Sequence, residues 1–180
     1  MQFQIIAAFT HHNSTGYINT PLYSIENEKT RFQALTLHKE SSKENNVIII
    51  DKNTYKSISK QQRSFKGRTK IVISHKTTSK GRKYKENITV PNLDSAMYIA
   101  SSLPNVGSVF LLGSSFYQNI AIEDKRCIRV YITLVKDSKE NYNILVKHSH
   151  PMEEKLCNYS LVRHRYVDNC HEHLIYERKV

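Results

Sequence analysis

Long hydrophobic runs are missing from this sequence. No apolar stretch reaches the roughly 18 residues that a membrane-spanning helix needs. The apolar opening from Met1 to Thr10 has neither a basic leader nor a small-residue cleavage site, so its pattern favours a strand over a signal peptide. We expect a soluble cytoplasmic protein without a membrane partner.

Cysteine is scarce as well. The three cysteines, Cys127, Cys157 and Cys170, form no C-x-x-C pair. An odd number leaves one thiol unpaired in any disulfide scheme, which argues against a disulfide scaffold. The sequence therefore predicts reduced thiols.

Length and composition allow one hydrophobic core. The chain has 180 residues, of which 39% are hydrophobic, and two complete domains would be cramped in that length. We expect residues 1–180 to form a single domain.

Positive charge is in excess, with a formal net charge of +11. The lysines are spread along the chain, which indicates composition bias more than a nucleic-acid footprint. The exception is Lys76 to Lys85, where five basic residues fall in one loop-like stretch. A basic polyanion-binding module stays the minor alternative, because a cofactor phosphate or a polyanionic substrate explains a positive field equally well.

Segments of strand length alternate with segments of helix length. The predicted strands cover Phe3 to Phe9, Val47 to Ile50, Lys70 to Ser74, Val109 to Leu112 and Ile128 to Val135. The predicted helices cover Asn27 to His38, Thr54 to Ser59, Leu93 to Leu103 before Pro104, and a segment that opens at Gly113-Ser114-Ser115 and runs through Ile120.

The tail departs from this alternation. Two strands, Tyr159 to Val167 and His173 to Glu177, flank Asp168-Asn169 and predict an antiparallel hairpin. The polar stretch Ser138 to Cys157 predicts a loop or irregular edge. The expected fold is α/β, with a mostly parallel central sheet, helices on both faces, a C-terminal antiparallel hairpin and binding at the carboxyl ends of the strands.

Short matches to one known family run through almost the whole chain in order. They are Phe3-Gln4-Ile5-Ile6-Ala7-Ala8, Gly16, Pro21, Asn27-Glu28, Phe32-Gln33, Thr36, Lys52, Thr54-Tyr55, Ser57-Ile58, Arg63, Lys66-Gly67-Arg68, Ser74, Leu93-Asp94, Ala96, Gly113-Ser114-Ser115, Tyr117, Tyr131 and Thr133. Each match is weak alone. The ordered set resembles the dihydrofolate reductase family in its vertebrate-like form.

The resemblance implies a folate site around Glu28, the catalytic acid. Glu28 and Phe32 are four residues apart in a predicted helix, so an acid and an aromatic ring share one face. By resemblance, Arg68 grips the carboxylate of the folate tail and Thr133 bonds the acid. The apolar walls of the substrate site are Ile6, Ala8, Ile58 and Leu111.

Each of these positions has an ordinary structural alternative. Glu28 also suits a solvated, charged helix start, Glu26-Asn27-Glu28, and an arginine after a glycine turn is commonly a surface residue. The apolar wall residues suit a plain core.

The resemblance also implies a nicotinamide cofactor, NADPH, with NADH as the alternative. Two helix starts are expected to meet its phosphates, because free N–H groups and the helix dipole attract anions. The implied cofactor-binding residues are Ala8, Gly16, Lys52, Asn53, Thr54, Ser74, His75, Gly113, Ser114, Ser115 and Phe116.

Several positions depart from the family pattern on the cofactor side. Asp51 stands where the family has glycine and puts a negative charge where the backbone meets pyrophosphate. Leu112 replaces the first of two glycines, at a cis bond in the family. His75 and Pro91 stand where arginines commonly read the 2′-phosphate. The family's loop tryptophan is Leu22, and the chain has no tryptophan.

The spacing of two histidines raises the question of a metal site. His171 and His173 alternate in a predicted strand and could share a face. No cysteine or acidic ligand set surrounds them in the sequence, and the family needs no metal, so we expect no metal site.

Two functions follow. The first is reduction of 7,8-dihydrofolate to tetrahydrofolate by hydride transfer from NADPH, supporting one-carbon and thymidylate metabolism. The alternative is a catalytically weak or inactive folate-binding protein of the same fold, with impaired dinucleotide binding because of Asp51 and Leu112. In both, the partner is a small-molecule folate, nucleic acid is not expected to bind, and we expect a monomer.

Overall fold

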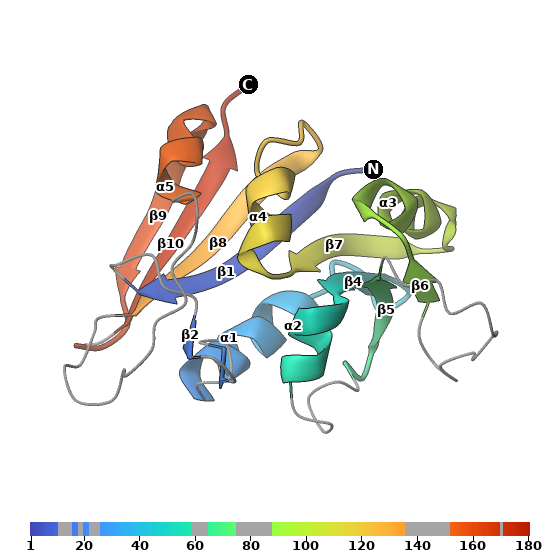
Figure 1. The fold of residues 1–180 in the computed structure, drawn as a ribbon, viewed down its shortest axis with the longest axis horizontal. Helices are drawn as coiled ribbons and strands as arrows, with labels where there is room; N and C mark the ends of the chain where they lie inside the picture. The colour runs from blue at the N-terminus through green and yellow to red at the C-terminus, as the bar shows by residue number, and fades with distance from the viewer. Residues whose placement is uncertain are drawn as a thin grey trace.

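The computed structural model describes residues 1–10, 16–17, 20–21, 26–58, 65–74, 88–135, 152–169 and 171–180. Their main feature is an eight-stranded sheet with the order β6-β5-β4-β7-β1-β8-β10-β9 (Figure 1). Its strands are β1 (Phe3–Thr10), β4 (Asn45–Asp51), β5 (Arg68–Ile73), β6 (Ile88–Val90), β7 (Val106–Leu112), β8 (Cys127–Val135), β9 (Tyr159–Tyr166) and β10 (His171–Arg178). A separate pair joins β2 (Gly16–Tyr17) to β3 (Thr20–Pro21).

The sheet is parallel from β6 to β8 and antiparallel at its C-terminal edge. β1 pairs in parallel with both β7 and β8, while β10 pairs antiparallel with β8 and with β9. The predicted mostly parallel sheet with a C-terminal antiparallel hairpin is thereby confirmed.

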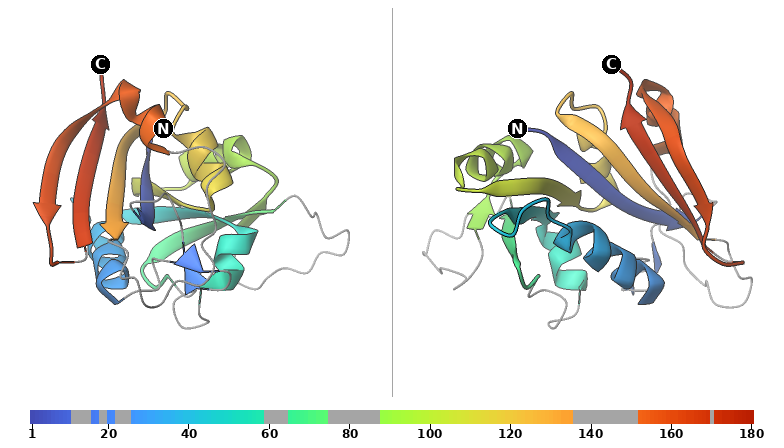
Figure 2. Two further views of the ribbon diagram at one scale, coloured as in Figure 1. Left: turned by 60° about the vertical axis from the view of Figure 1, so that its left-hand side comes forward. Right: turned by 180° about the vertical axis from the view of Figure 1, so that it is seen from behind.

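Helices cover both faces of the sheet (Figures 1 and 2). α1 (Glu26–Leu37) and α2 (Lys52–Ser57) lie on one face, and α3 (Leu93–Ser102) and α4 (Ser115–Ala121) on the other. Because both faces are covered, the inner strands are continuous apolar runs, as in Val47 to Ile50, which is buried at every position. Alternate residues of β4 belong to two separate hydrophobic clusters, with Val47 and Ile49 in one and Ile48 and Ile50 in the other.

Local sequence signals explain where two helices begin. The Asn92 side chain accepts a hydrogen bond from the Ser95 N–H at 2.8 Å and caps α3, and the helix ends just before Leu103 and Pro104, as predicted. α2 begins at Lys52, two residues before the predicted start at Thr54, because the Asp51 side chain caps it.

The predicted loop from Ser138 to Cys157 is corrected at its C-terminal end. Residues 152–158 form α5 (Met152–Lys155) and a 3-10 helix (Leu156–Asn158). Leu156 is buried in the cluster on the α3 and α4 face, and this tertiary contact stabilises a turn of helix that the polar sequence did not indicate. Residues 138–151 of the predicted loop lie outside the described residues.

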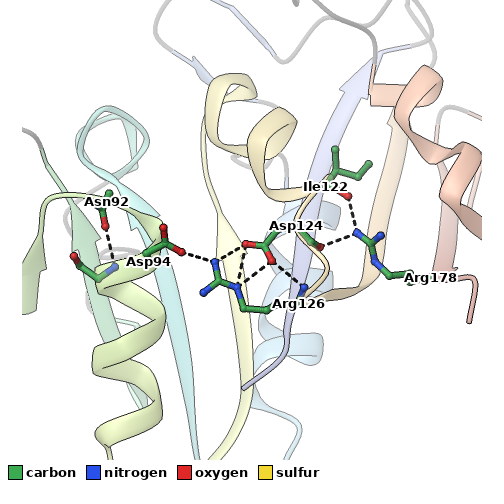
Figure 3. Close-up of polar contacts among 7 residues, drawn as sticks. Asn92, Asp94, Ile122, Asp124, Arg126 and Arg178 are labelled. Atoms are coloured by element: carbon green, nitrogen blue, oxygen red, sulfur yellow. Dashed lines mark hydrogen bonds and ion pairs between the residues drawn. The ribbon is translucent and has the colours of Figure 1, made fainter.

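Arg178 ties the C-terminal hairpin to the loop before β8 (Figure 3). Its Nη2 donates to the carbonyls of Ile122 at 2.9 Å and Asp124 at 2.7 Å, and its Nε donates to the Cys127 carbonyl at 2.7 Å. The guanidinium carbon also lies 4.7 Å from the centre of the Tyr159 ring. One half-buried side chain therefore satisfies three carbonyls at a chain reversal.

The neighbouring Arg126 extends this network to α3. Its Nη2 pairs with Asp94 at 2.6 Å and with Asp124 at 2.5 Å. Side-chain hydrogen bonds from Arg126 lower the pKa of Asp124. The network therefore links the first turn of α3 to the loop that leads into β8.

Within the described residues, none of the helices is both long and apolar enough to cross a membrane.

Replacement of Arg178 by alanine should lower the free energy of unfolding by about 2 to 3 kcal/mol, because several carbonyls lose a charged donor. Urea denaturation followed by circular dichroism measures the change. Arg163→Ala is the matched control, since Arg163 is exposed on β9 of the same hairpin. Equal effects of the two substitutions would contradict this role for Arg178.

The described cysteines should differ in reactivity. Cys127 is fully buried, and burial raises the pKa of its thiol to about 11, whereas Cys157 is exposed. Since the thiolate is the reactive form, iodoacetamide should label Cys157 at least about 100-fold faster at pH 8. Peptide mass spectrometry resolves the two sites. Similar rates in the native protein would refute the burial of Cys127.

Candidate functional site

The predicted site residues gather largely where the parallel strands end. Ala8 lies near the end of β1, Thr133 near the end of β8, and Ser74 directly after β5. The starts of α2 and α4 follow the ends of β4 and β7. Parallel strands present their carboxyl ends at one edge of a sheet, so the topology brings these positions together.

Glu28 is a buried acid in the first turn of α1. The residue is 3% exposed, and its Oε1 lies 3.6 Å from Nε2 of His173 on β10. Within the described part of the chain, neither of these two atoms has a hydrogen-bond partner. A buried carboxylate oxygen without a donor is costly, which makes Oε1 available to a ligand donor.

Arg31 is a second polar residue at this place. Its Nη1 donates to the Ile132 carbonyl at 3.0 Å and to the Thr133 hydroxyl. Burial lowers the pKa of Arg31, and the nearby Glu28 opposes that change. No hydrogen bond between Glu28 and Thr133 occurs among the described residues, so the role predicted for Thr133 stays a prediction.

Sequence reasoning missed Arg31 and His173 as neighbours of Glu28. For Arg31 a signal was available, since residues three apart in a helix share a face. For His173 none was, because only strand pairing brings β10 beside α1.

Aromatic and aliphatic side chains line a pocket beside α1. The lining residues are Lys29, Phe32, Gln33, Ile58, Phe65, Arg68 and Leu112. Of the predicted substrate residues, Phe32, Ile58 and Arg68 therefore come together here, and Ile6 belongs to the same hydrophobic cluster as Ile58. The cavity has a volume of about 40 Å³.

Leu111, predicted as a wall of the substrate site, lies elsewhere. It is fully buried in the cluster on the α3 and α4 face, whereas Leu112 lines the pocket. Successive residues of a strand point to opposite faces, so a one-residue difference exchanges wall for core. Leu112, and not Leu111, therefore lines this pocket, and the substrate role predicted for Leu111 stays a prediction. Ala8 is also buried in the cluster that contains Leu111.

Arg68 is held at the edge of this pocket. Its Nη1 donates to the Thr36 hydroxyl at 2.5 Å, and its guanidinium carbon lies 5.5 Å from the Phe32 ring centre and 5.6 Å from that of Phe65. Burial lowers the pKa of Arg68. Its Nε is buried without a hydrogen-bond partner in the described part of the chain, so the guanidinium retains a donor for an anion.

Asp51 joins the starts of α2 and α4. Its Oδ1 accepts hydrogen bonds from the N–H groups of Asn53 at 3.0 Å and Thr54 at 3.1 Å. Its Oδ2 accepts from the Thr54 hydroxyl at 2.5 Å and from the Ser114 N–H at 2.7 Å. The residue is 4% exposed. The carboxylate that the sequence placed against a cofactor phosphate is therefore fully engaged by the protein's own donors.

Gly113 lies against this network. A Cβ at Gly113 would meet Tyr117 Cβ at 3.2 Å and Asp51 Oδ2 at 3.5 Å. The Leu112–Gly113 peptide bond is trans, since no cis bond occurs in the described residues.

The remaining predicted cofactor residues have varied settings. The Ser74 N–H donates to the Val90 carbonyl at 2.8 Å, Ser114 caps α4 without a side-chain hydrogen bond, and Phe116 is exposed. Gly16 lies in β2, Lys52 and Asn53 open α2, and Ser115 opens α4. His75 lies outside the described residues.

His171 and His173, the two histidines that alternate in β10, lie against different acidic residues. The described segments contain no group of three histidine, cysteine or acidic residues placed to hold an ion. His171 Nδ1 is 2.9 Å from the Asp168 carboxylate, while His173 lies against Glu28.

A second cavity of about 550 Å³ lies between α1 and the amino ends of the strands. Its lining includes Gln4, Asn46 and Ser108 at strand starts and His38 just after α1. Arg31, which also bonds the Thr133 hydroxyl, lines this cavity as well.

Comparison with known sequences identifies relatives of this chain. The family model described as dihydrofolate reductase matches residues 2–152. The chain is 25% identical over 135 residues to dihydrofolate reductase from Drosophila melanogaster, covering 75% of this chain and 74% of the relative.

Longer relatives match over only part of their length. A bifunctional dihydrofolate reductase-thymidylate synthase from Acanthamoeba polyphaga mimivirus is 27% identical over 140 residues, covering 74% of this chain and 24% of that protein. Dihydrofolate reductase from Schizosaccharomyces pombe is 30% identical over 138 residues, covering 66% and 30%. The chain thus spans about a quarter of the bifunctional relative.

The family match covers residues 2–152, which include the acid on α1 and the residues of the pocket beside it, whereas β9 and β10 lie beyond the matched span. The chain belongs to the dihydrofolate reductase family.

Proposed function

We propose that this protein binds 7,8-dihydrofolate beside α1 and reduces it to tetrahydrofolate, with NADPH as the hydride donor and NADH as the alternative. The observation that carries the proposal is Glu28, a buried acid whose Oε1 lacks a donor. Family membership supports the same reaction class.

The chemistry of Glu28 suits a pterin. The edge of that ring presents ring and amino N–H groups, which would supply the donors that a buried carboxylate lacks. A carboxyl held at this edge can also pass a proton toward the ring in the reduction. Phe32, one helical turn along α1, supplies an aromatic surface for the flat ligand.

Arg68 suits the other end of the substrate. Its guanidinium lies at the rim of the same pocket as Phe32 and keeps a buried Nε without a partner among the described residues. A planar guanidinium can bind both oxygens of a carboxylate. We therefore assign Arg68 to the tail of the folate.

The residues proposed for the cofactor phosphates do not fit that role as they stand. The N–H groups of Asn53, Thr54 and Ser114 already donate to the Asp51 carboxylate. A phosphate arriving there would meet a buried negative charge and donors that are already used. The groups around Asp51 therefore take no part in the proposed chemistry.

The mismatch between the Asp51 hydrogen bonds and the expected phosphate site favours a second candidate function. A folate-binding protein of the same fold, catalytically weak or inactive, would keep Glu28, Phe32 and Arg68 and bind dinucleotides poorly. The observation that favours it is the closed hydrogen-bond network of Asp51.

Glu28→Gln should abolish the proposed reaction without loss of fold. We expect dihydrofolate-dependent NADPH oxidation to fall about 100-fold or more, because an amide cannot replace the proton transfer of the acid. Absorbance at 340 nm follows the rate, with methotrexate-inhibited enzyme as background. Glu154→Gln is the control, since Glu154 is exposed on α5. A clean wild-type preparation with no turnover at millimolar NADPH or NADH would refute the reductase proposal.

Asp51→Gly separates the two candidates. Removal of the carboxylate should free the N–H groups of α2 and α4, so that NADPH raises the Tm more in the variant than in the wild type. Loss of the helix cap lowers the starting Tm, so the ligand-induced shift is the quantity compared. Asp51→Asn, which keeps size but not charge, is the control.

Folate should raise the Tm equally in wild type and Asp51→Gly, since Glu28 is intact in both. An NADPH shift as large in the wild type as in Asp51→Gly would contradict the obstruction by Asp51 and favour the active reductase.

A further inference from the structure

A histidine on β10 lies against the acid on α1. His173 Nε2 is 3.6 Å from Glu28 Oε1, and the two side chains are 19% and 4% exposed. Both atoms are buried, and neither hydrogen-bonds to another group in the described segments. Two polar atoms left facing one another in a protein interior call for a functional explanation.

Strand register creates this contact. His173 pairs across from Thr133 on β8, and Ile175 pairs across from Tyr131. Directly paired residues in antiparallel strands project to the same face, so His173 shares its face with Thr133. The Thr133 hydroxyl in turn accepts a hydrogen bond from Arg31 of α1. α1, β8 and β10 thus build one polar cluster around Glu28.

The charged neighbours of His173 can be named element by element. α1 contributes Glu28, with Arg31 beside that acid, and β9 contributes the exposed Arg165, which pairs across from His173. β10 itself contributes His171, two residues along the strand and paired with Asp168. A proton on His173 would interact favourably with the Glu28 carboxylate and unfavourably with the arginines.

We propose that His173 is a positioning residue for Glu28, holding the carboxyl group aimed at its ligand. The inference rests on the proposed function in taking a pterin as that ligand. In this proposal β10 contributes a residue that orients the acid of α1.

The pH dependence of binding follows from charge. A positive charge beside a carboxylate favours its charged form, and an imidazole is the side chain that ordinarily gains charge between pH 8 and pH 5. The wild type should therefore retain affinity to a lower pH than a variant without the imidazole.

Folate affinity measured by isothermal titration calorimetry between pH 5 and 8 tests this role. In His173→Phe and His173→Gln, the pH at which affinity has fallen tenfold should lie about half to one unit higher than in the wild type. His173→Lys, which keeps a positive charge, should restore the wild-type midpoint. The ligand's own titration is common to all variants and cancels in the comparison.

His164→Gln is the matched control. His164 pairs with Glu172 at 3.0 Å and lies opposite Leu174 in the same hairpin, so it belongs to the other face of the sheet. Its pH profile should match the wild type. Circular dichroism checks that each variant is folded.

The failure of this inference is distinct from failure of the proposed function. If Glu28→Gln binds folate as the wild type does, the folate site itself is wrong. If Glu28→Gln loses binding while His173→Phe and His173→Gln both reproduce the wild-type pH profile, the role of His173 is overturned and that of Glu28 stands.

Discussion

The parallel pairing of β1 with β7 on one side and β8 on the other is the constraint on which the rest of the structure depends. It sets three carboxyl ends at one edge of the sheet and leaves both faces to be covered by helices. Ala8, Thr133 and the start of α4 come from distant parts of the sequence, and they share this edge because the pairing fixes where each strand ends.

The surroundings of Glu28 and of Asp51 differ in how far their polar groups are hydrogen-bonded within the protein. Around Glu28, buried polar atoms face one another without satisfied hydrogen bonds in the described residues, an arrangement that a ligand would complete. At Asp51, both carboxylate oxygens already accept hydrogen bonds from the protein's own donors. A buried carboxylate with four such contacts stabilises the junction of α2 and α4, at the cost of donors that an external anion would need.

Periodicity was sufficient to find most of the sheet and α3, because burial on both faces or on one helical face leaves a regular apolar pattern. It failed where tertiary contacts decide. The 3-10 helix after α5 carries Leu156, which is buried in the core, and the pleat of β7 directs Leu111 into that core and Leu112 to the pocket. The hydrogen bond from the Ser114 N–H to Asp51 joins residues 63 positions apart.

The sequence by itself determined the α/β class, the family, the acid on α1 and the presence of a charge at position 51, since these depend on local patterns and on ordered matches along the chain. Only the tertiary structure decided what surrounds that acid and that charge. The pairing of β10 with β8 brings His173 to Glu28, and the closeness of β4 and β7 brings the Ser114 N–H to Asp51. Contacts between distant segments carry no period along the chain, so they become visible only in three dimensions.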